Sequence, residues 1–217
     1  MKDNFNVTPL FSIPLYQTVL QDVSSECLEY IKGCEYKRFP ADNGYGTPNK
    51  FLLDLKELHP LKSQIMASCE HFLYDVLDVD KSIKFEITNS WANKHLKGDE
   101  SGAHTHVNSM ISGVFYVQTN EQSGEILFHK EKTNYNIFMP TVNIPFNGKN
   151  LNLFNSDGWA IRPKNNMLIL FPSTLNHSVY PNQSDEERYC VAFNLFAFGK
   201  FGFDNVTQLG LDNTTQA

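Results

Sequence analysis

The stretch Gly102-Ala103-His104-Thr105-His106-Val107-Asn108 carries two imidazoles two positions apart and reads as a β-strand. Alternate residues of a strand point to the same face, so His104 and His106 are predicted to aim at one point. A third imidazole, His177, and a cation, Arg188, follow much later in the chain. Two close ligands, one distant ligand and a nearby cation are typical of a metal site beside an anion site. An isolated His-x-His is equally compatible with two polar residues on a solvent-exposed strand, so the neighbouring sequence must decide whether the pair binds a metal.

The bulk composition indicates one folded domain. Hydrophobic residues make up 41% and aromatic residues 13% of the 217 residues, while only 19% are charged, which excludes a disordered chain. The net charge of −6 argues against nucleic acid as a partner. No apolar run approaches the length of a membrane span, and the first residues lack a signal-peptide core. The four cysteines are scattered like ordinary reduced thiols, so the predicted location is the cytoplasm.

The first 80 residues are predicted to support the rest of a single domain that spans residues 1–217. Two prolines in residues 9–20 indicate an edge strand or an extended lead-in. N-cap residues at 22–25 begin a short helix that ends near Gly33, and a helical apolar stripe runs from Pro60 to Leu77. The polar residues 35–51 are predicted to form a long loop.

Residues 81–198 change to short alternating runs that predict a mainly β core. Many short strands separated by Gly, Asn, Pro or Asp indicate a sandwich, barrel or jelly roll. The predicted strands are 83–87, 91–96, 110–119, 125–129, 151–154, 159–162, 167–171, 178–180 and 189–198. Residues 132–150 form an insertion that is a candidate substrate lid, and residues 199–217 form a polar tail.

Several blocks of this core share a pattern. They are Trp91-Ala92-Asn93, Lys97-Gly98-Asp99, His104-Thr105-His106, Ser112 to Val117, Leu170 to Ser173, His177 and Arg188 to Asn194. Together they resemble the 2-oxoglutarate/iron(II) oxygenase family related to the prolyl 4-hydroxylases, which is often met in phage genomes. The resemblance implies a double-stranded β-helix, that is, a jelly-roll barrel with flanking N-terminal helices. It also implies Fe(II) as the metal, with 2-oxoglutarate and O2 as co-substrates.

The resemblance also implies roles for single residues. His177 matches the distal metal histidine, Arg188 the anchor of the 2-oxoglutarate carboxylate, and Tyr116 a tyrosine near that carboxylate. The proximal pair departs from the family, because His-x-His stands where most members have His-x-Asp or His-x-Glu.

Two alignments of this pair stay open. Either His104 and His106 both bind the metal, which we favour, or His106-x-Asn108 is the aligned pair and His104 only supports it. Further pocket candidates are Asn93, Asn108, Ser112 and Asn194.

The leading hypothesis is a dioxygenase that hydroxylates a C–H bond and releases succinate and CO2. The resemblance points to a peptidyl, prolyl-like group of a peptide or protein as prime substrate, in the cytoplasm, or in the host cytoplasm if the chain is phage-encoded. The alternatives are a non-catalytic jelly-roll binding or virion-associated module, and a cupin-like metalloenzyme without 2-oxoglutarate. Arg188 separates them, because neither alternative needs a cation there. A homodimer stays open as the oligomeric state.

Overall fold

The computed structural model of the chain describes residues 6–10, 12–39, 44–130, 152–202 and 208–212. The strands are β1 Tyr16–Val19, β2 Lys37–Arg38, β3 Tyr45–Gly46, β4 Lys84–His95, β5 Ser101–His104, β6 Ile111–Gln118, β7 Ile126–His129, β8 Gly158–Ile161, β9 Met167–Pro172, β10 His177–Val179, β11 Arg188–Phe201 and β12 Leu209–Leu211. The helices are α1 Ser25–Lys32 and α2 His59–Glu70, with short turns η1 Leu52–Asp54, η2 Lys56–Leu58 and the π-helical η3 His71–Val76.

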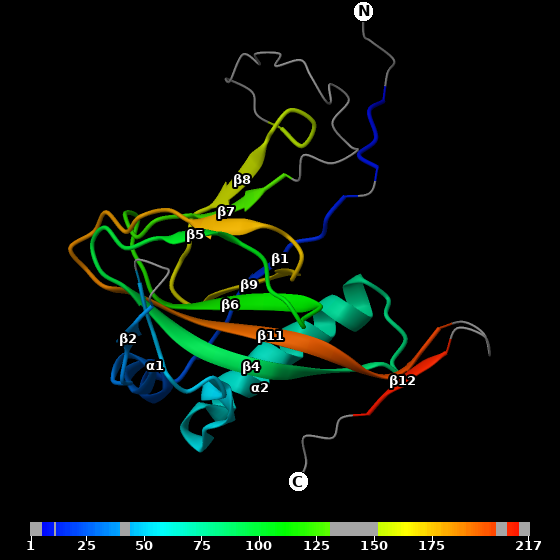
Figure 1. The fold of residues 1–217 in the computed structure, drawn as a ribbon, viewed down its shortest axis with the longest axis horizontal. Coiled ribbons are helices and arrows are strands. Elements are labelled where there is room, and N and C mark those ends of the chain that lie inside the picture. The colour runs from blue at the N-terminus through cyan, green and yellow to red at the C-terminus, as the bar shows by residue number, and fades with distance from the viewer. Residues whose placement is uncertain (1–5, 11, 40–43, 131–151, 203–207, 213–217) are drawn as a thin grey trace, which may run out of the picture.

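Two antiparallel sheets face each other, as the predicted jelly roll requires. The major sheet has the order β1-β9-β6-β11-β4-β3-β2, with β12 paired to β11. The minor sheet has the order β5-β10-β7-β8. Neighbouring strands are mostly distant in sequence, which is the wound connectivity of a double-stranded β-helix. In Figure 1 the minor sheet lies above the major sheet, and α2 runs along the opposite side of the major sheet.

Capping hydrogen bonds mark both ends of α1. Ser24 caps α1 by accepting a hydrogen bond from the Glu26 N–H at 3.2 Å, and Gly33 closes its end by donating to Glu29. The second predicted helix is confirmed as α2 and then widens into the π-helical η3. The part of the chain that the structure describes holds no helix long and apolar enough to cross a membrane.

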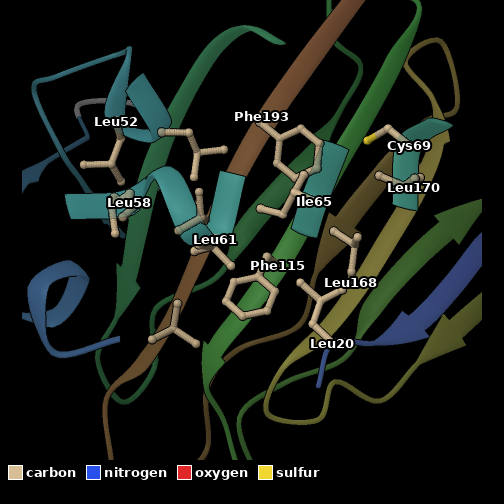
Figure 2. Close-up of a cluster of buried hydrophobic side chains, with 14 of the residues drawn as sticks. Leu20, Leu52, Leu58, Leu61, Ile65, Cys69, Phe115, Leu168, Leu170 and Phe193 are labelled. Atoms are coloured by element: carbon tan, nitrogen blue, oxygen red, sulfur yellow. The ribbon is translucent and has the colours of Figure 1, made fainter. Parts of the chain in front are cut away.

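Both faces of the central strands are buried, because alternate residues serve two cores. One core lies between the helices and the major sheet, where Phe115 and Leu168 meet Leu61 and Ile65 of α2 (Figure 2). The other lies between the sheets, where their strand neighbours Tyr116 and Ile169 and further residues of both sheets pack. Strands buried on both faces read as continuous apolar runs, as Met167 to Phe171 does.

Several predicted boundaries need correction. Runs 83–87 and 91–96 join into the single strand β4, because Ser90 is satisfied by the Leu53 N–H and a bulge at Thr88 keeps the register with β11. The run 151–154 is not a strand over its described residues 152–154: the Asn152 and Asn155 side chains accept backbone N–H groups and form a turn. Short strands β2 and β3 occur in the predicted loop 35–51 and β12 in the predicted tail. The lid candidate 132–150 lies outside the described residues.

Candidate metal centre and its cavity

A cavity with a volume of about 520 Å³ lies between the two sheets. The minor sheet and its adjoining loop line it with Ser101, His104, His106, Ile126, His177 and Val179. The major sheet lines it with Asn89, Trp91, Asn93, His95, Gly113, Val114, Tyr116, Phe171, Arg188, Cys190 and Ala192, and Phe39 and Lys50 stand beside it. Three of the predicted metal ligands and the predicted carboxylate anchor therefore share one space.

The three predicted histidines meet at the minor sheet. His104 ends β5 and pairs in register with His177 at the start of β10. One ring nitrogen each of His104, His106 and His177 lies within 4.8 Å of the others, and the ring centroids are 4.3–5.2 Å apart. The prediction that His104 and His106 point together is confirmed, although β5 stops at His104 and His106 follows in the adjoining loop.

Backbone contacts hold His106 in place beyond the end of its strand. Its N–H donates to the Ser173 carbonyl at 3.0 Å, and Ser173 belongs to the turn that leads into His177. The Ser173 hydroxyl is bonded in turn to those of Ser109 at 2.7 Å and Ser112 at 2.8 Å. This hydroxyl cluster ties the His106 loop to the His177 turn.

Hydrogen bonds fix which nitrogen of two rings is free. Nδ1 of His104 lies 2.8 Å from the Gly102 carbonyl, and Nδ1 of His177 lies 2.9 Å from the Leu175 carbonyl. A carbonyl only accepts, so both Nδ1 atoms carry a proton, and in the neutral form of each ring Nε2 is the nitrogen with a free lone pair. This is the common arrangement of metal-binding imidazoles.

Two rings of the cluster, the buried His177 and the half-buried His106, are held neutral. Burial lowers the pKa of His177 to about 3, and the neighbouring His104 and His106 lower it further against the opposing effect of the Leu175 carbonyl. Burial and then His104 lower the pKa of His106 to about 4. A neutral imidazole is the form that binds a metal ion.

Arg188 is buried in the cavity wall at the start of β11, with 2% of its surface exposed. Nη1 donates to the Ser123 carbonyl at 3.1 Å and Nη2 lies 2.6 Å from Nδ1 of His95. Its Nε is buried without a partner, and no carboxylate of the described residues forms an ion pair with this guanidinium. A buried guanidinium without a counter-charge among the described residues fits an anionic ligand.

The other predicted pocket residues divide into two groups. Tyr116 and Asn93 line the cavity, and burial raises the pKa of the Tyr116 phenol, which keeps it protonated beside Arg188. Ser112 and Asn194 do not line the cavity; they lie behind it in a chain of 2.8 Å hydrogen bonds that ends at the lining residue Asn89. Asn108 is exposed, has a φ of 54° and does not line the cavity.

His95 is a lining residue that sequence reasoning missed. It is 4% exposed, and burial together with the Arg188 charge lowers its pKa to about 3. A signal was present, because Trp91, Asn93 and His95 alternate along one predicted strand and therefore share a face. The strand register then pairs His95 directly with Arg188.

The donor set fits a first-row divalent metal ion. Three imidazole nitrogens on one side of a cavity can bind such an ion and leave further coordination positions for small molecules. The orphaned guanidinium N–H in the same cavity fits a carboxylate. Together the two halves of the cavity can hold a chelating acid by its metal-binding end and by a distant carboxylate.

Comparisons with known proteins agree with this geometry. Residues 89–194 match the family model described as "Putative 2OG-Fe(II) oxygenase". No curated protein matches the sequence.

Similar folds occur in solved structures at low sequence identity. An oxidoreductase of the 2OG-Fe(II) oxygenase family from Burkholderia pseudomallei has a TM-score of 0.54 at 13% identity, covering 77% of this chain and 74% of that one. HygX from Streptomyces hygroscopicus, with nickel and 2-oxoglutarate bound, has a TM-score of 0.55 at 11% identity and coverages of 84% and 82%. A Pseudomonas putida prolyl-4-hydroxylase has a TM-score of 0.53 at 11% identity and coverages of 84% and 93%.

Proposed function

We propose that this chain, whose residues 89–194 match the 2OG-Fe(II) oxygenase family model, hydroxylates a C–H bond of a peptidyl, prolyl-like substrate. The metal is Fe(II), and 2-oxoglutarate and O2 are the co-substrates. The observation that carries the proposal is the shared cavity of three converging imidazoles and one buried, unpaired guanidinium.

In this proposal His104, His106 and His177 hold the iron, the first and last of them through Nε2. The proton positions support this assignment for His104 and His177, whose Nδ1 atoms are engaged by carbonyls. When bound, Fe(II) with 2-oxoglutarate and O2 supplies the oxidation of C–H to C–OH, coupled to the release of succinate and CO2. With three neutral ligands, the protein leaves the full charge of the metal for its anionic co-substrate.

Arg188 is the proposed anchor of the distal carboxylate, through its free Nε–H and the remaining N–H groups of the fork. The phenol of Tyr116 lines the same cavity and is the proposed second donor. Both groups are almost fully buried, and a charge-assisted hydrogen bond is strongest where water is excluded. Arg188 and Tyr116 therefore orient the acid, while the minor sheet holds its chelating end.

The peptidyl substrate is the finer part of the proposal and rests on the resemblance and on the fold shared with the Pseudomonas putida prolyl-4-hydroxylase. The cavity lining supports a substrate site near the metal, because the Trp91 ring lies 6.1 Å from that of His106 and Lys50 Nζ lies over the Trp91 ring. We also propose a cytoplasmic location, which the unpaired state of all four cysteines supports.

The test is turnover of 2-oxoglutarate by the whole chain with added Fe(II) and no prime substrate. We expect slow formation of succinate that stops when iron is removed by a chelator and returns when iron is restored. A cupin-like enzyme or a binding module predicts no succinate, because neither uses 2-oxoglutarate. Absence of succinate from a protein that has been shown to bind both iron and 2-oxoglutarate would reject the proposed activity.

A further inference from the structure

The guanidinium of Arg188 is held from two sides by uncharged acceptors. Nη1 donates to the Ser123 carbonyl at 3.1 Å and Nη2 donates to Nδ1 of His95 at 2.6 Å. Ser123 and His95 are themselves almost fully buried, at 1% and 4% exposed. The plane of the fork is thereby fixed, and its Nε–H faces no protein acceptor among the described residues.

The chemistry of the pair determines the state of His95. Arginine has only N–H donors, so Nδ1 of His95 must be unprotonated and the neutral ring carries its proton on Nε2. Burial and the adjacent Arg188 both lower the pKa of this ring, so it stays neutral at physiological pH. The ring is also confined: a Cβ at Gly44 would lie 2.6 Å from its Nε2, and Asn182 donates to its backbone carbonyl at 3.1 Å.

An aspartate or glutamate is the usual partner of a buried arginine, and among the described residues none forms an ion pair with Arg188. A carboxylate at the position of His95 would orient the fork equally well but would cancel its charge. The imidazole orients the fork and leaves the charge in place. The site therefore combines a fixed geometry with an uncompensated cation.

We propose that His95 is a positioning residue that orients Arg188 with a neutral acceptor, so that the full positive charge is reserved for the distal carboxylate of the 2-oxo acid. This inference rests on the proposed function, since it assumes that Arg188 receives that carboxylate. It goes further by giving His95 a role in selecting dicarboxylic over monocarboxylic 2-oxo acids. His95 itself need not touch the ligand.

The test uses three replacements of similar size, His95→Asn, His95→Leu and His95→Asp. Asn keeps a neutral acceptor near the position of Nδ1, Leu removes the acceptor, and Asp keeps an acceptor but adds a negative charge. Affinities for 2-oxoglutarate are measured by calorimetry in the presence of Mn(II), which binds the site without turnover. The matched probe is 2-oxopentanoate, which has the same chelating end and no distal carboxylate.

We expect His95→Asn to bind 2-oxoglutarate within about threefold of the parent, and His95→Leu about tenfold more weakly, because a buried donor loses its acceptor. His95→Asp should be weaker still, by about a hundredfold or more, because an internal ion pair competes with the ligand. Affinity for 2-oxopentanoate and for Mn(II) should change little in all three. A role in packing alone would not separate Asn from Leu and Asp in this way.

Equal 2-oxoglutarate affinity for the Asn, Leu and Asp variants would overturn the role of His95, as would a parallel loss of 2-oxopentanoate binding. Thermal unfolding of each variant shows whether it is folded. If the Asp variant does not fold, the contrast of Asn with Leu decides alone, and equal affinities overturn the inference. A parent protein that binds Mn(II) but not 2-oxoglutarate would reject the proposed function instead, and the inference with it.

Discussion

The metal end and the anchor end of the cavity are built in opposite ways. The metal end consists of short strands and loops of the minor sheet, and its histidines range from exposed His104 to buried His177. The anchor end consists of long central strands of the major sheet, where His95, Tyr116 and Arg188 are each less than 5% exposed. One end is reachable from solvent and the other is enclosed.

This difference suits the two tasks. A metal that meets O2 and a prime substrate needs an open side, and residues at strand ends provide it. A carboxylate anchor benefits from a rigid, water-poor setting, where a charge-assisted bond is strong and its direction is fixed. The two sheets therefore contribute separate functions to one cavity, which each of the following experiments probes at one end.

The largest expected effect is at the metal end. His177→Ala removes a buried ligand and should abolish stoichiometric iron binding, while the jelly roll stays folded because His177 lies at the edge of the inter-sheet core. Metal content by mass spectrometry and circular dichroism measure the two properties together. His59→Ala, at the exposed start of α2, is the matched control. Parental iron content in the His177 variant would remove this residue from the site.

The second effect is at the anchor end and should leave the metal end intact. Arg188→Ala should weaken 2-oxoglutarate binding by about 2–5 kcal/mol, the usual result of removing one partner of a buried charge pair. Arg188→Lys keeps the charge without the fork and should fall between the parent and the Ala variant. Calorimetry measures the affinities, and Arg162→Ala, an exposed arginine paired with Glu125, is the control. Identical affinities in all these proteins would contradict the anchor.

The third effect is smaller and is a dependence of protein stability on pH, to which one histidine from each end of the cavity contributes. His177 and His95 have native pKa values of about 3, so below pH 6.5 only the unfolded chain takes up these protons. Stability of the metal-free protein is therefore complete above pH 6.5 and falls as the pH drops toward 3. At pH 5 each ring should contribute a loss of about 2 kcal/mol relative to neutral pH.

Denaturant unfolding of chelator-treated protein at pH 7 and pH 5 measures this loss. His95→Asn should make the loss of unfolding free energy between pH 7 and pH 5 smaller by about 2 kcal/mol, the contribution of one ring. His59→Ala, at an exposed residue, should leave this loss unchanged. A metal-free protein that is equally stable at both pH values would show that the two rings titrate normally.

Sequence patterns predicted the two ends unequally. The mainly β core followed from alternation, because period-two patterns determine which residues share a face. The convergence of His104 with His106 was predicted on the same ground, but His106 lies in the loop after β5 and is held there by the Ser173 carbonyl. The end of β5 at His104 and the turn at 152–155 did not, because they depend on side chains that bond locally to the backbone. Boundaries of this kind are decided by single hydrogen bonds rather than by a run of residues.

Local sequence patterns could not predict that His95 is the partner of Arg188. His95 and Arg188 are far apart in sequence and meet only through the register of β4 with β11. From His95 to Asn89 this pairing runs without a shift, and the bulge at Thr88 lies beyond it, so only the pairing of the two whole strands brings His95 to Arg188. The lining residues Lys50 and Phe39 were missed for a similar reason, because both come from the segment that had been predicted to be a long loop.

The smallest effect concerns the second alignment of the proximal pair, in which His106-x-Asn108 supplies the metal ligands. The structure favours His104 with His106, because Asn108 is exposed and outside the cavity lining. Asn108→Asp should therefore leave iron affinity unchanged, since it adds a carboxylate on a solvent-exposed turn. His106→Asp, which places a carboxylate at a proposed ligand position, should retain iron where His106→Ala loses it. Anaerobic iron titrations of the three variants compare these positions directly. Tighter iron binding by Asn108→Asp, together with parental iron binding by His104→Ala, would show that His106 and position 108, not His104 and His106, bind the metal. The assignment of Arg188 as the carboxylate anchor would not be affected.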